Sequence, residues 1–415
     1  MGYLYDLEGK KMKVALVVGA RPNFMKAAPI LRAIDDANQH ELCTITPLLV
    51  HTGQHYDTAL SDAFFSDLNL PAPNIYLNVG SGSHAVQTAE IMRRFEGVLE
   101  TEHPDAVLVV GDVNSTVACA LVTAKFSFGA ANSRPLLAHV EAGLRSFDRA
   151  MPEECNRIVT DHLSDLLFVT EESGLRNLKN EGISADRVFF AGNTMIDSVL
   201  ACEERAECST VLDQLGLVMP HGNGSAEVRP YVVLTLHRPA NVDNRGAFTE
   251  ILEGLHEVAA AQTVVFPAHP RTQKRINEHR LERYFSFLTS NNRHGRDEAG
   301  PGLTVIEPLG YLDFLCLLKH ASLVVTDSGG IQEETTCLGV PCVTLRDNTE
   351  RPITLTNGTN VLGGTQQYTI RAAIREQLHR TYLRSFPEKW DGKAGARIVK
   401  ILLRFWKDAG IMARS

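Results

Sequence analysis

The feature that most constrains this 415-residue chain is a recurring pattern of short apolar runs separated by longer amphipathic stretches. Runs of four to six residues rich in Val, Leu and Ile are typical of strands buried on both faces of a parallel sheet, with crossover helices between them. The pattern predicts an α/β protein with two doubly wound, Rossmann-like units in tandem. The runs occupy residues 14–19, 47–52, 106–111, 136–140, 166–170 and 188–192, and then 231–236, 263–267, 303–306, 323–326 and 342–345.

The length of the chain indicates that these runs belong to two domains. A single hydrophobic core usually stops growing at about 250 to 300 residues. The stretch at residues 210–229 contains PHGNGSAE, whose Gly, Pro and Ser content we expect to sustain neither strand nor helix. We therefore predict an N-terminal domain over residues 12–209, which carries the candidate catalytic acids, and a C-terminal domain over residues 230–395. The apolar helix of residues 396–415 is expected to pack back on the N-terminal domain.

Charge and cysteine content exclude several classes of function. The chain has 41 Lys and Arg against 49 Asp and Glu, a net charge of −8, and no basic run interleaved with aromatics, so we expect no nucleic-acid partner. No apolar run approaches the roughly 18 to 20 residues of a membrane helix, and residues 1–11 do not read as a signal peptide. The 8 cysteines lack a CxxC pair or a zinc spacing. We therefore expect a cytoplasmic protein with reduced core thiols, no membrane partner and no metal.

Two polar segments follow the first two predicted strands, where ligands bind in open α/β sheets. The first, GARPNFMK, places Arg21 and Lys26 at the start of a helix whose amides favour anions. A solvated turn with two surface cations would explain the same residues, and both interpretations stay open. The second, HTGQH, contributes Gln54 and two histidines, which we interpret as a polar lining or a core histidine because a third metal ligand is missing.

Carboxylates follow the next two predicted strands. Asp112 in GDVNST comes at the tip of a buried strand, where poor solvation raises a carboxyl pKa and suits it to proton transfer, although capping of the next helix is the alternative. Glu141 and Glu153 lie in HVEAGLRSFDRAMPEECNR, the densest polar segment of the chain. An acid in the first turn of a helix interacts favourably with the helix dipole, and this alternative is sufficient to account for one of the two acids Glu153 and Glu154. The same segment supplies the candidate substrate ligands Arg145 and Arg157.

The second half of the chain carries a cluster of candidate phosphate ligands. The segment TDSGGIQEET predicts a strand, a turn of small residues and a helix, so that backbone amides can approach a diphosphate. It lacks the GKS or GKT of a Walker loop. The other candidates follow strands in TLHRPAN, PAHPRT and LRDNTERP. The residues are His237, Arg238, His269, Ser328, Gly329, Gly330, Glu334 and Arg351.

Taken together, the motifs resemble those of the non-hydrolysing UDP-N-acetylglucosamine 2-epimerases. GARPNFMK, TGQH, GDVNST, HVEAGLR with PEECNR, GNTMIDS, HRPAN, TDSGGIQEE and RDNTERP occur in the order and spacing of that family. The resemblance spans residues 13–364. It implies a glycosyltransferase-B type fold with two Rossmann-like domains facing across a cleft, a UDP-binding C-terminal domain, a homodimer, and neither metal nor nicotinamide cofactor. The chain departs from many members at Asn23, where they carry Glu, and at residues 239–241.

The resemblance also implies a reaction, the interconversion of UDP-N-acetylglucosamine and UDP-N-acetylmannosamine. Proton abstraction from sugar carbon 2 with anti elimination of UDP gives 2-acetamidoglucal, and UDP re-adds with protonation from the opposite face. Asp112, Glu141, Glu153 and His237 match the catalytic positions of the family. Ser328, Gly329 and Gly330 match its diphosphate cradle, and Glu334 matches its ribose ligand. We expect the remaining substrate contacts from Arg21, Lys26, Gln54, Arg145, Arg157, Arg238, His269 and Arg351.

Four alternatives remain from the sequence. Within the family, the substrate could be a modified UDP-N-acetyl sugar, such as a diacetamido uronic acid or an N-acetylfucosamine derivative. A hydrolysing epimerase would admit water to the glucal and release free N-acetylmannosamine. The fold could also serve a UDP-sugar glycosyltransferase, although transfer needs one base and the chain offers several acids. A catalytically dead nucleotide-sugar binder is the last alternative, and the intact acids argue against it.

Overall fold

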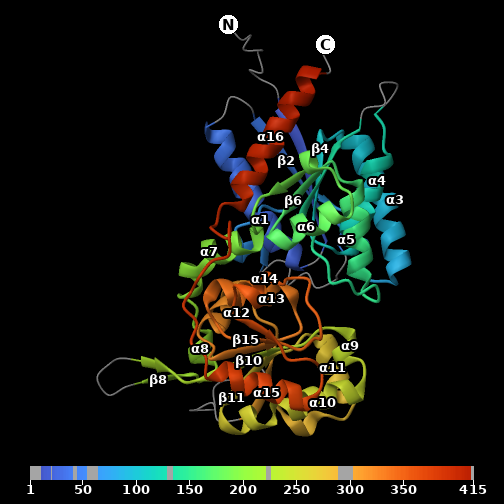
Figure 1. Ribbon diagram of the computed structural model, residues 1–415. Coiled ribbons are helices and arrows are strands. Elements are labelled where there is room, and N and C mark those ends of the chain that lie inside the picture. Colours follow the sequence, from blue (N-terminus) through green and yellow to red (C-terminus); the bar gives the residue numbers. More distant parts are fainter. Residues whose placement is uncertain are drawn as a thin grey trace. The chain divides into compact units, whose positions relative to one another are not determined.

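The computed structural model describes residues 11–19, 21–40, 44–53, 64–128, 134–220, 226–287 and 302–412. The chain divides into two compact units, unit 1 with Met1–Leu200 and Glu388–Ser415 and unit 2 with Ala201–Pro387. Each unit contains a seven-stranded sheet whose neighbouring strands are all parallel, covered by helices (Figure 1). The prediction of an α/β protein with two doubly wound sheets is therefore confirmed.

Unit 1 is organised around strands that are buried on both faces. Its sheet has the order β3-β2-β1-β4-β5-β6-β7, with β1 and β4 at its centre. The apolar runs of the first half all become strands of this sheet, while β3 has only two residues and gives no run of its own. The strands are β1 (Lys11–Val18), β2 (Thr44–His51), β3 (Ile75–Tyr76), β4 (Ala106–Val110), β5 (Leu136–Ala142), β6 (Leu166–Val169) and β7 (Val188–Phe190).

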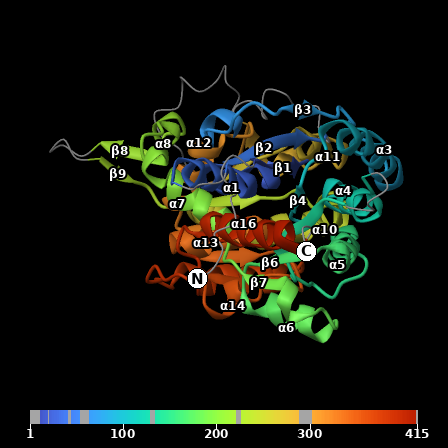
Figure 2. The same cartoon turned by 90° about the horizontal axis from the view of Figure 1, so that it is seen from above.

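The helices of unit 1 include one from the far end of the chain. Helix α16 packs along α1 (Figure 2). A side chain at Gly395 would bring its Cβ within 2.5 Å of the Pro29 carbonyl oxygen, so the close approach of the two helices needs glycine there. The helices are α1 (Arg21–His40), α3 (His84–Glu102), α4 (Asn114–Lys125), α5 (Pro152–Leu163), α6 (Glu172–Asn180) and α16 (Ala394–Met412), and α7 (Thr194–Ala206) begins in unit 1 and continues past Leu200 into unit 2.

Unit 2 repeats the design with its own core. Its sheet has the order β12-β13-β11-β10-β14-β15-β16. Helices α10 and α15 pack against each other and contribute to the same apolar core as the sheet. The strands are β10 (Tyr231–Thr235), β11 (Thr263–Pro267), β12 (Phe285–Phe287), β13 (Gly302–Ile306), β14 (Leu323–Thr326), β15 (Cys342–Thr344) and β16 (Asn360–Leu362). The helices are α9 (Pro239–Val242), α10 (Arg245–Ala261), α11 (Pro270–Glu278), α12 (Tyr311–Lys319), α13 (Gly329–Leu338), α14 (Ile353–Thr356) and α15 (Gln367–Leu378).

The stretch at residues 210–229 differs from the expectation of an irregular boundary. It contains α8 (Val211–Gln214) and a two-stranded antiparallel sheet of β8 (Val218–Pro220) and β9 (Ala226–Val228). Because α8 packs on α12, this stretch belongs to unit 2, and the division of the chain falls earlier, between Leu200 and Ala201. The chain returns to unit 1 at Glu388, which lies before the predicted end of the second domain at residue 395.

Two expectations from composition can be compared with the described residues. Among them, no helix is long and apolar enough to cross a membrane, and no group of three or more His, Cys, Asp or Glu side chains could hold a metal ion. Cys155 and Cys208 are exposed, against the expectation of core thiols throughout, and the other described cysteines are buried.

Candidate active site

In unit 1, polar side chains gather where β1, β4 and β5 end. These strands are neighbours in a parallel sheet, so their carboxyl ends lie at one edge. Lys26 from α1 forms an ion pair with Glu141 from β5, and each side chain is only 6% exposed. A Cβ added to Gly111, at the end of β4, would lie 3.2 Å from Lys26 Nζ. The three strand ends thus build one compact group around a buried ion pair.

Asn23 belongs to the same group. Its side chain is buried and donates to the Val110 carbonyl oxygen at 2.6 Å, while its Oδ1 accepts from Gly19 N–H at 3.4 Å. The amide therefore ties the first turn of α1 to the end of β4. A neutral side chain suits this place, since Glu141 is already near and a second carboxylate would repel it.

The backbone at Glu141 is unusual. Its φ is +77°, and the pairing of β5 with β6 shifts register between Val140 and Ala142. The sequence predicts a strand that ends at Val140, but the strand continues through this bulge to Ala142. Left-handed backbone at a non-glycine residue costs about 1–3 kcal/mol and is concentrated at functional sites, and bulges re-aim side chains. The bulge explains how Glu141 turns toward Lys26.

Asp112 lies beside a second buried cation. Its carboxylate, whose side chain is 25% exposed, forms an ion pair with Arg157 of α5, which is itself buried. Asn156 donates to the Asp112 carbonyl oxygen at 2.8 Å. The cation stabilises the charged carboxylate and opposes the desolvation that we expected to dominate at this position.

The adjacent acids Glu153 and Glu154 have different surroundings. Glu154 is buried and accepts hydrogen bonds from Ser146 N–H at 3.0 Å and Phe147 N–H at 2.8 Å, besides an ion pair with Arg157 at 2.8 Å. Burial alone would raise the pKa of Glu154, but the Ser146 amide and the Arg157 guanidinium hold that pKa below its ordinary value. Glu154 thus fixes the loop before α5, and the half-buried Glu153 takes no part in these contacts.

A buried network of charged side chains lies next to the same strand ends. His139 Nδ1 lies 2.6 Å from Asp161 Oδ1, and His139 Nε2 lies 2.8 Å from the Gly111 carbonyl oxygen. Arg145 pairs with Asp161 at 2.7 Å and with Glu181 at 2.7 Å. Burial by itself would raise the pKa of Asp161, but the His139 and Arg145 charges hold it below its ordinary value. The structure therefore commits Arg145 to this network and does not bring it to Asp112 or Lys26.

In unit 2, the main feature is a histidine–aspartate pair after β10 and β14. His237 Nδ1 lies 2.9 Å from Asp327 Oδ1, and the Arg238 and His237 backbone amides donate to the same carboxylate at 3.0 and 3.2 Å. Asn241 Nδ2 donates to it at 3.1 Å. Asp327 is fully buried, whereas the His237 side chain is 56% exposed. The pair therefore combines a solvent-exposed imidazole with a carboxylate that solvent does not reach.

The Gly-rich turn begins directly after Asp327. Ser328 N–H donates to Thr326 Oγ1 at 3.0 Å, and α13 starts at Gly329. The first amides of a helix have no intrahelical partners. A Cβ at Gly329 would lie 2.5 Å from Glu350 Oε1 and from Arg351 Nη1. A side chain at Gly329 would therefore displace the ends of the Glu350 and Arg351 side chains from the turn.

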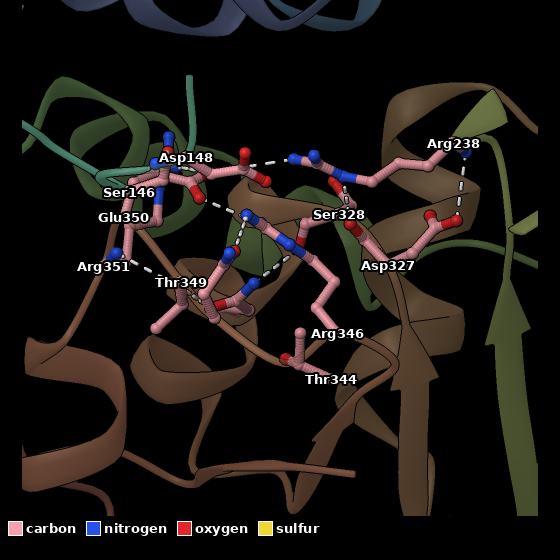
Figure 3. A network of polar contacts seen from close by, with 12 residues as sticks. Ser146, Asp148, Arg238, Asp327, Ser328, Thr344, Arg346, Thr349, Glu350 and Arg351 are labelled. Atoms are coloured by element: carbon pink, nitrogen blue, oxygen red, sulfur yellow. Dashed lines mark hydrogen bonds and ion pairs between the residues drawn. The ribbon is translucent and has the colours of Figure 1, made fainter. Parts of the chain in front are cut away.

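That segment contributes charged side chains around the turn (Figure 3). Arg351 pairs with Glu333 at 2.9 Å and with Glu350 at 2.5 Å, and Arg346 pairs with Glu350 at 2.8 Å. Arg238 approaches Glu350 at 3.9 Å. These side chains lie beside the N-terminus of α13, where backbone amides favour an anionic ligand.

The remaining candidates are dispersed. Glu334 is buried in α13, where its charge, after burial itself, raises the pKa of the neighbouring Tyr311. His269 is exposed and caps α11 by accepting from Arg271 N–H at 3.2 Å. Gln54 and the side chain of Arg21 lie outside the described residues.

Sequence reasoning gave no role to Asp327, Asn241, His139 or Asp161. Asp327 could have been found by the argument applied to Asp112, because both carboxylates directly follow a buried strand. His139 and Asp161 carry no comparable signal, since their pairing depends on how β5 and α5 pack.

Comparisons with known proteins agree on one family. A family model described as UDP-N-acetylglucosamine 2-epimerase matches residues 37–403. A UDP-N-acetylglucosamine 2-epimerase of Methanocaldococcus jannaschii is 42% identical over 394 residues, which cover 94% of this chain and 99% of the relative. A UDP-2,3-diacetamido-2,3-dideoxy-D-glucuronate 2-epimerase of Pseudomonas aeruginosa is 37% identical over 396 residues, covering 95% and 100%.

Solved structures give the same result. The Methanocaldococcus jannaschii UDP-GlcNAc 2-epimerase in complex with UDP-GlcNAc and UDP has a TM-score of 0.80 at 41% identity, covering 95% of this chain and 100% of that one. The UDP-GlcNAc 2-epimerase of Neisseria meningitidis bound to UDP-GlcNAc has a TM-score of 0.75 at 30% identity, with the same coverage.

Proposed function

The chain belongs to the UDP-N-acetylglucosamine 2-epimerase family of isomerases, and we propose that it interconverts UDP-N-acetylglucosamine and UDP-N-acetylmannosamine. The observation that carries this proposal is the pair of carboxylates at neighbouring strand ends. Glu141 and Asp112 each lie against a buried cation, Lys26 and Arg157 respectively. Inversion of carbon 2 requires proton transfer on two faces of the sugar, and two carboxylates at one sheet edge suit that requirement.

We propose elimination followed by re-addition. A carboxylate removes the proton from carbon 2, the electrons of that C–H bond form the carbon 1–carbon 2 double bond, and the bond from carbon 1 to the UDP oxygen breaks. UDP leaves with that electron pair, which gives 2-acetamidoglucal. In the second half, an acid protonates carbon 2 from the opposite face and a phosphate oxygen of UDP bonds to carbon 1. Asp112, Glu141 and Glu153 are the proposed proton-transfer groups.

Unit 2 is proposed to hold UDP. As the bond to carbon 1 breaks, negative charge grows on the diphosphate, and donors aimed at that charge lower the barrier. The residues of the Gly-rich turn, Ser328, Gly329 and Gly330, with His237 and Arg238, are the proposed diphosphate ligands. We propose Glu334 as the ribose ligand and Arg351 as the group that orders the turn, because it already pairs with Glu333 and Glu350.

Other roles follow from the contacts of each residue. Arg145 has its guanidinium occupied by Asp161 and Glu181, so we propose that it supports the sheet edge and does not contact the sugar. Elimination and re-addition neither oxidise nor reduce the substrate, so the reaction needs no nicotinamide. We propose a homodimer on the strength of the family resemblance.

Proton NMR with UDP-N-acetylglucosamine in deuterated water tests the proposal. We expect the carbon 2 proton to be lost to solvent while UDP-N-acetylmannosamine appears. Free N-acetylmannosamine together with UDP would indicate the hydrolysing alternative. Absence of exchange with this substrate, while other UDP-sugars turn over, would contradict the proposed substrate.

The Pseudomonas aeruginosa relative supports a second candidate substrate, because its name gives a diacetamido uronic acid and its identity to this chain, 37%, is close to that of the first relative. Comparing kcat/KM for the two nucleotide sugars separates them. A higher value for UDP-2,3-diacetamido-2,3-dideoxyglucuronate would replace the proposed substrate and keep the proposed chemistry.

A further inference from the structure

The imidazole of His237 lies on a carboxylate that the proposed function leaves without a role. Asp327 is fully buried and follows β14 directly. Its two oxygens accept from His237 N–H at 3.2 Å, Arg238 N–H at 3.0 Å and Asn241 Nδ2 at 3.1 Å, and Oδ1 lies 2.9 Å from His237 Nδ1. A buried carboxylate with four donors around it is held in one orientation.

Asp327 is ionised at neutral pH. Burial alone would raise its pKa, but the charge and hydrogen bond of His237, the Arg238 amide and the Asn241 side chain hold the pKa below its ordinary value. An ionised carboxylate only accepts hydrogen bonds, so the proton of the contact with His237 must sit on Nδ1. The tautomer of the histidine follows from the charge of its neighbour.

Nε2, the second ring nitrogen, is therefore the atom that can gain or lose a proton. With Nδ1 protonated, Nε2 accepts a hydrogen bond in the neutral ring and donates one in the imidazolium. Within the part of the chain that the structure describes, no hydrogen bond of His237 Nε2 is recorded, and the ring is more than half exposed. We infer that Asp327 is a positioning residue, which holds His237 as the Nδ1–H tautomer and leaves Nε2 to serve the reaction.

The role of His237 in the reaction rests on the proposed function. Its tautomer is independent of that function, because it follows from the contact with Asp327. Arg238 is the charged neighbour of His237 in the chain, and its guanidinium approaches Glu350 at 3.9 Å and interacts with the charge of Arg346. A purely structural role is the competing explanation, because Asp327 also fixes the turn at residues 237–241 through backbone amides.

Nitrogen NMR of the full chain with ¹⁵N-histidine measures the tautomer without any turnover. His237→Gln identifies the resonances of His237 among the 15 histidines. We expect the wild-type ring to show the Nδ1–H pattern. In Asp327→Asn the amide can donate to Nδ1, so the ring should move to the Nε2–H form. Asp243→Asn, which removes another carboxylate of unit 2 from its pairs with Arg271 and Arg275, is the matched control and should leave the pattern unchanged.

Kinetics then separate positioning from structure. Removing the aspartate of a histidine–aspartate pair in hydrolases lowers kcat by about 10⁴, and we expect Asp327→Asn to lower it by about 10² to 10⁴. KM should change by less than about threefold, the pH profile of kcat should move, and Asp327→Glu should recover part of the rate. A wild-type ring in the Nε2–H form would overturn the inference, and so would Asp327→Asn with unchanged tautomer and pH profile. If the wild-type chain epimerises no UDP-sugar, the proposed function fails while the tautomer result stands.

Discussion

Each unit contains a histidine–aspartate pair next to the ends of its strands, His139–Asp161 in unit 1 and His237–Asp327 in unit 2, and the pairs differ in the surroundings of the second ring nitrogen. In unit 1, the His139 and Asp161 side chains are both fully buried, and His139 Nε2 lies 2.8 Å from the Gly111 carbonyl oxygen. In unit 2, Asp327 is equally buried, but the His237 side chain is 56% exposed. Both aspartates have a pKa held below the ordinary value.

The comparison shows that a histidine–aspartate pair is not by itself a reactive group. Both nitrogens of His139 face acceptors, so the ring satisfies them together only when it carries both protons. It then has no proton position left for chemistry, and its effect is to fix Gly111 next to Asp112. The pair in unit 2 keeps one nitrogen for a ligand. Exposure of a single ring edge separates a structural pair from a candidate functional one.

The largest effect should come from removing the acids that the unit 1 pair supports. We predict that Glu141→Gln and Asp112→Asn each lower the epimerisation rate by at least about 10³, because each removes a proposed proton-transfer group. UDP affinity, assigned here to unit 2, should change by less than about threefold. Coupled turnover assays and calorimetry with UDP measure the two quantities. Near-normal turnover in either variant would refute its assignment.

A matched pair of neighbouring acids sharpens this prediction. Glu153→Gln should lower turnover with little loss of stability, whereas Glu154→Gln should destabilise the loop before α5, which its carboxylate holds through Ser146 and Phe147. Equal losses of stability in both variants would contradict the assignment of Glu153 to turnover and of Glu154 to the stability of the loop.

Next in size is the difference between the two histidines. We predict that His139→Gln lowers the free energy of unfolding of unit 1 by about 3–5 kcal/mol, since it leaves the Asp161 charge short of a buried partner. His237→Gln should leave that stability unchanged and lower turnover instead. Both tryptophans, Trp390 and Trp406, belong to unit 1, so tryptophan fluorescence in urea reports on this unit.

The outcome that would break the comparison is a crossed result. Loss of unit 1 stability in His237→Gln, or full stability in His139→Gln, would mean that exposure does not distinguish the two pairs. His279→Gln in unit 2 is a suitable control, because that half-buried ring forms a hydrogen bond with a backbone group, the Val242 carbonyl oxygen at 3.1 Å, and not with a buried carboxylate.

How far the sequence predicts these features depends on the range of the interactions. The long buried strands are visible as apolar runs because the signal lies within a few residues. Three of the four edge strands, β3, β12 and β16, have two or three residues and give no such run, whereas the equally short edge strand β7 lies in the apolar run at residues 188–192. The sequence places the domain boundary at residues 210–229, whereas the chain divides after Leu200, because short elements with tertiary partners, such as α8 on α12, form despite Gly and Pro nearby.

The features of the candidate site also fall into those that the sequence predicts and those that depend on long-range packing. The proximity of Asp112 and Glu141 follows from their places after neighbouring strands. The cations that pair with them, Arg157 and Lys26, come from helices, and neither the packing of those helices nor the bulge at Glu141 has a local signature in the sequence. The ion-pair partners of the acids and the strained backbone at Glu141 could therefore be identified only from the structure, whereas the acids themselves could be identified from the sequence.

The smallest predicted effect is the acid dependence of unit 1 stability. Asp161 has a folded-state pKa below its unfolded value of about 3.9, so its contribution is present above that pH and is lost as the pH falls through the folded pKa. Because the amide introduced by Asp161→Asn does not titrate, the stability difference between wild type and this variant should shrink as the pH is lowered below about 4. Urea unfolding followed by tryptophan fluorescence between about pH 3 and 6 measures it. Asp327→Asn, which lies in unit 2, should leave this unit 1 curve parallel to that of the wild type, and a difference that stayed constant with pH in Asp161→Asn would show that the buried carboxylate contributes through shape and not through charge.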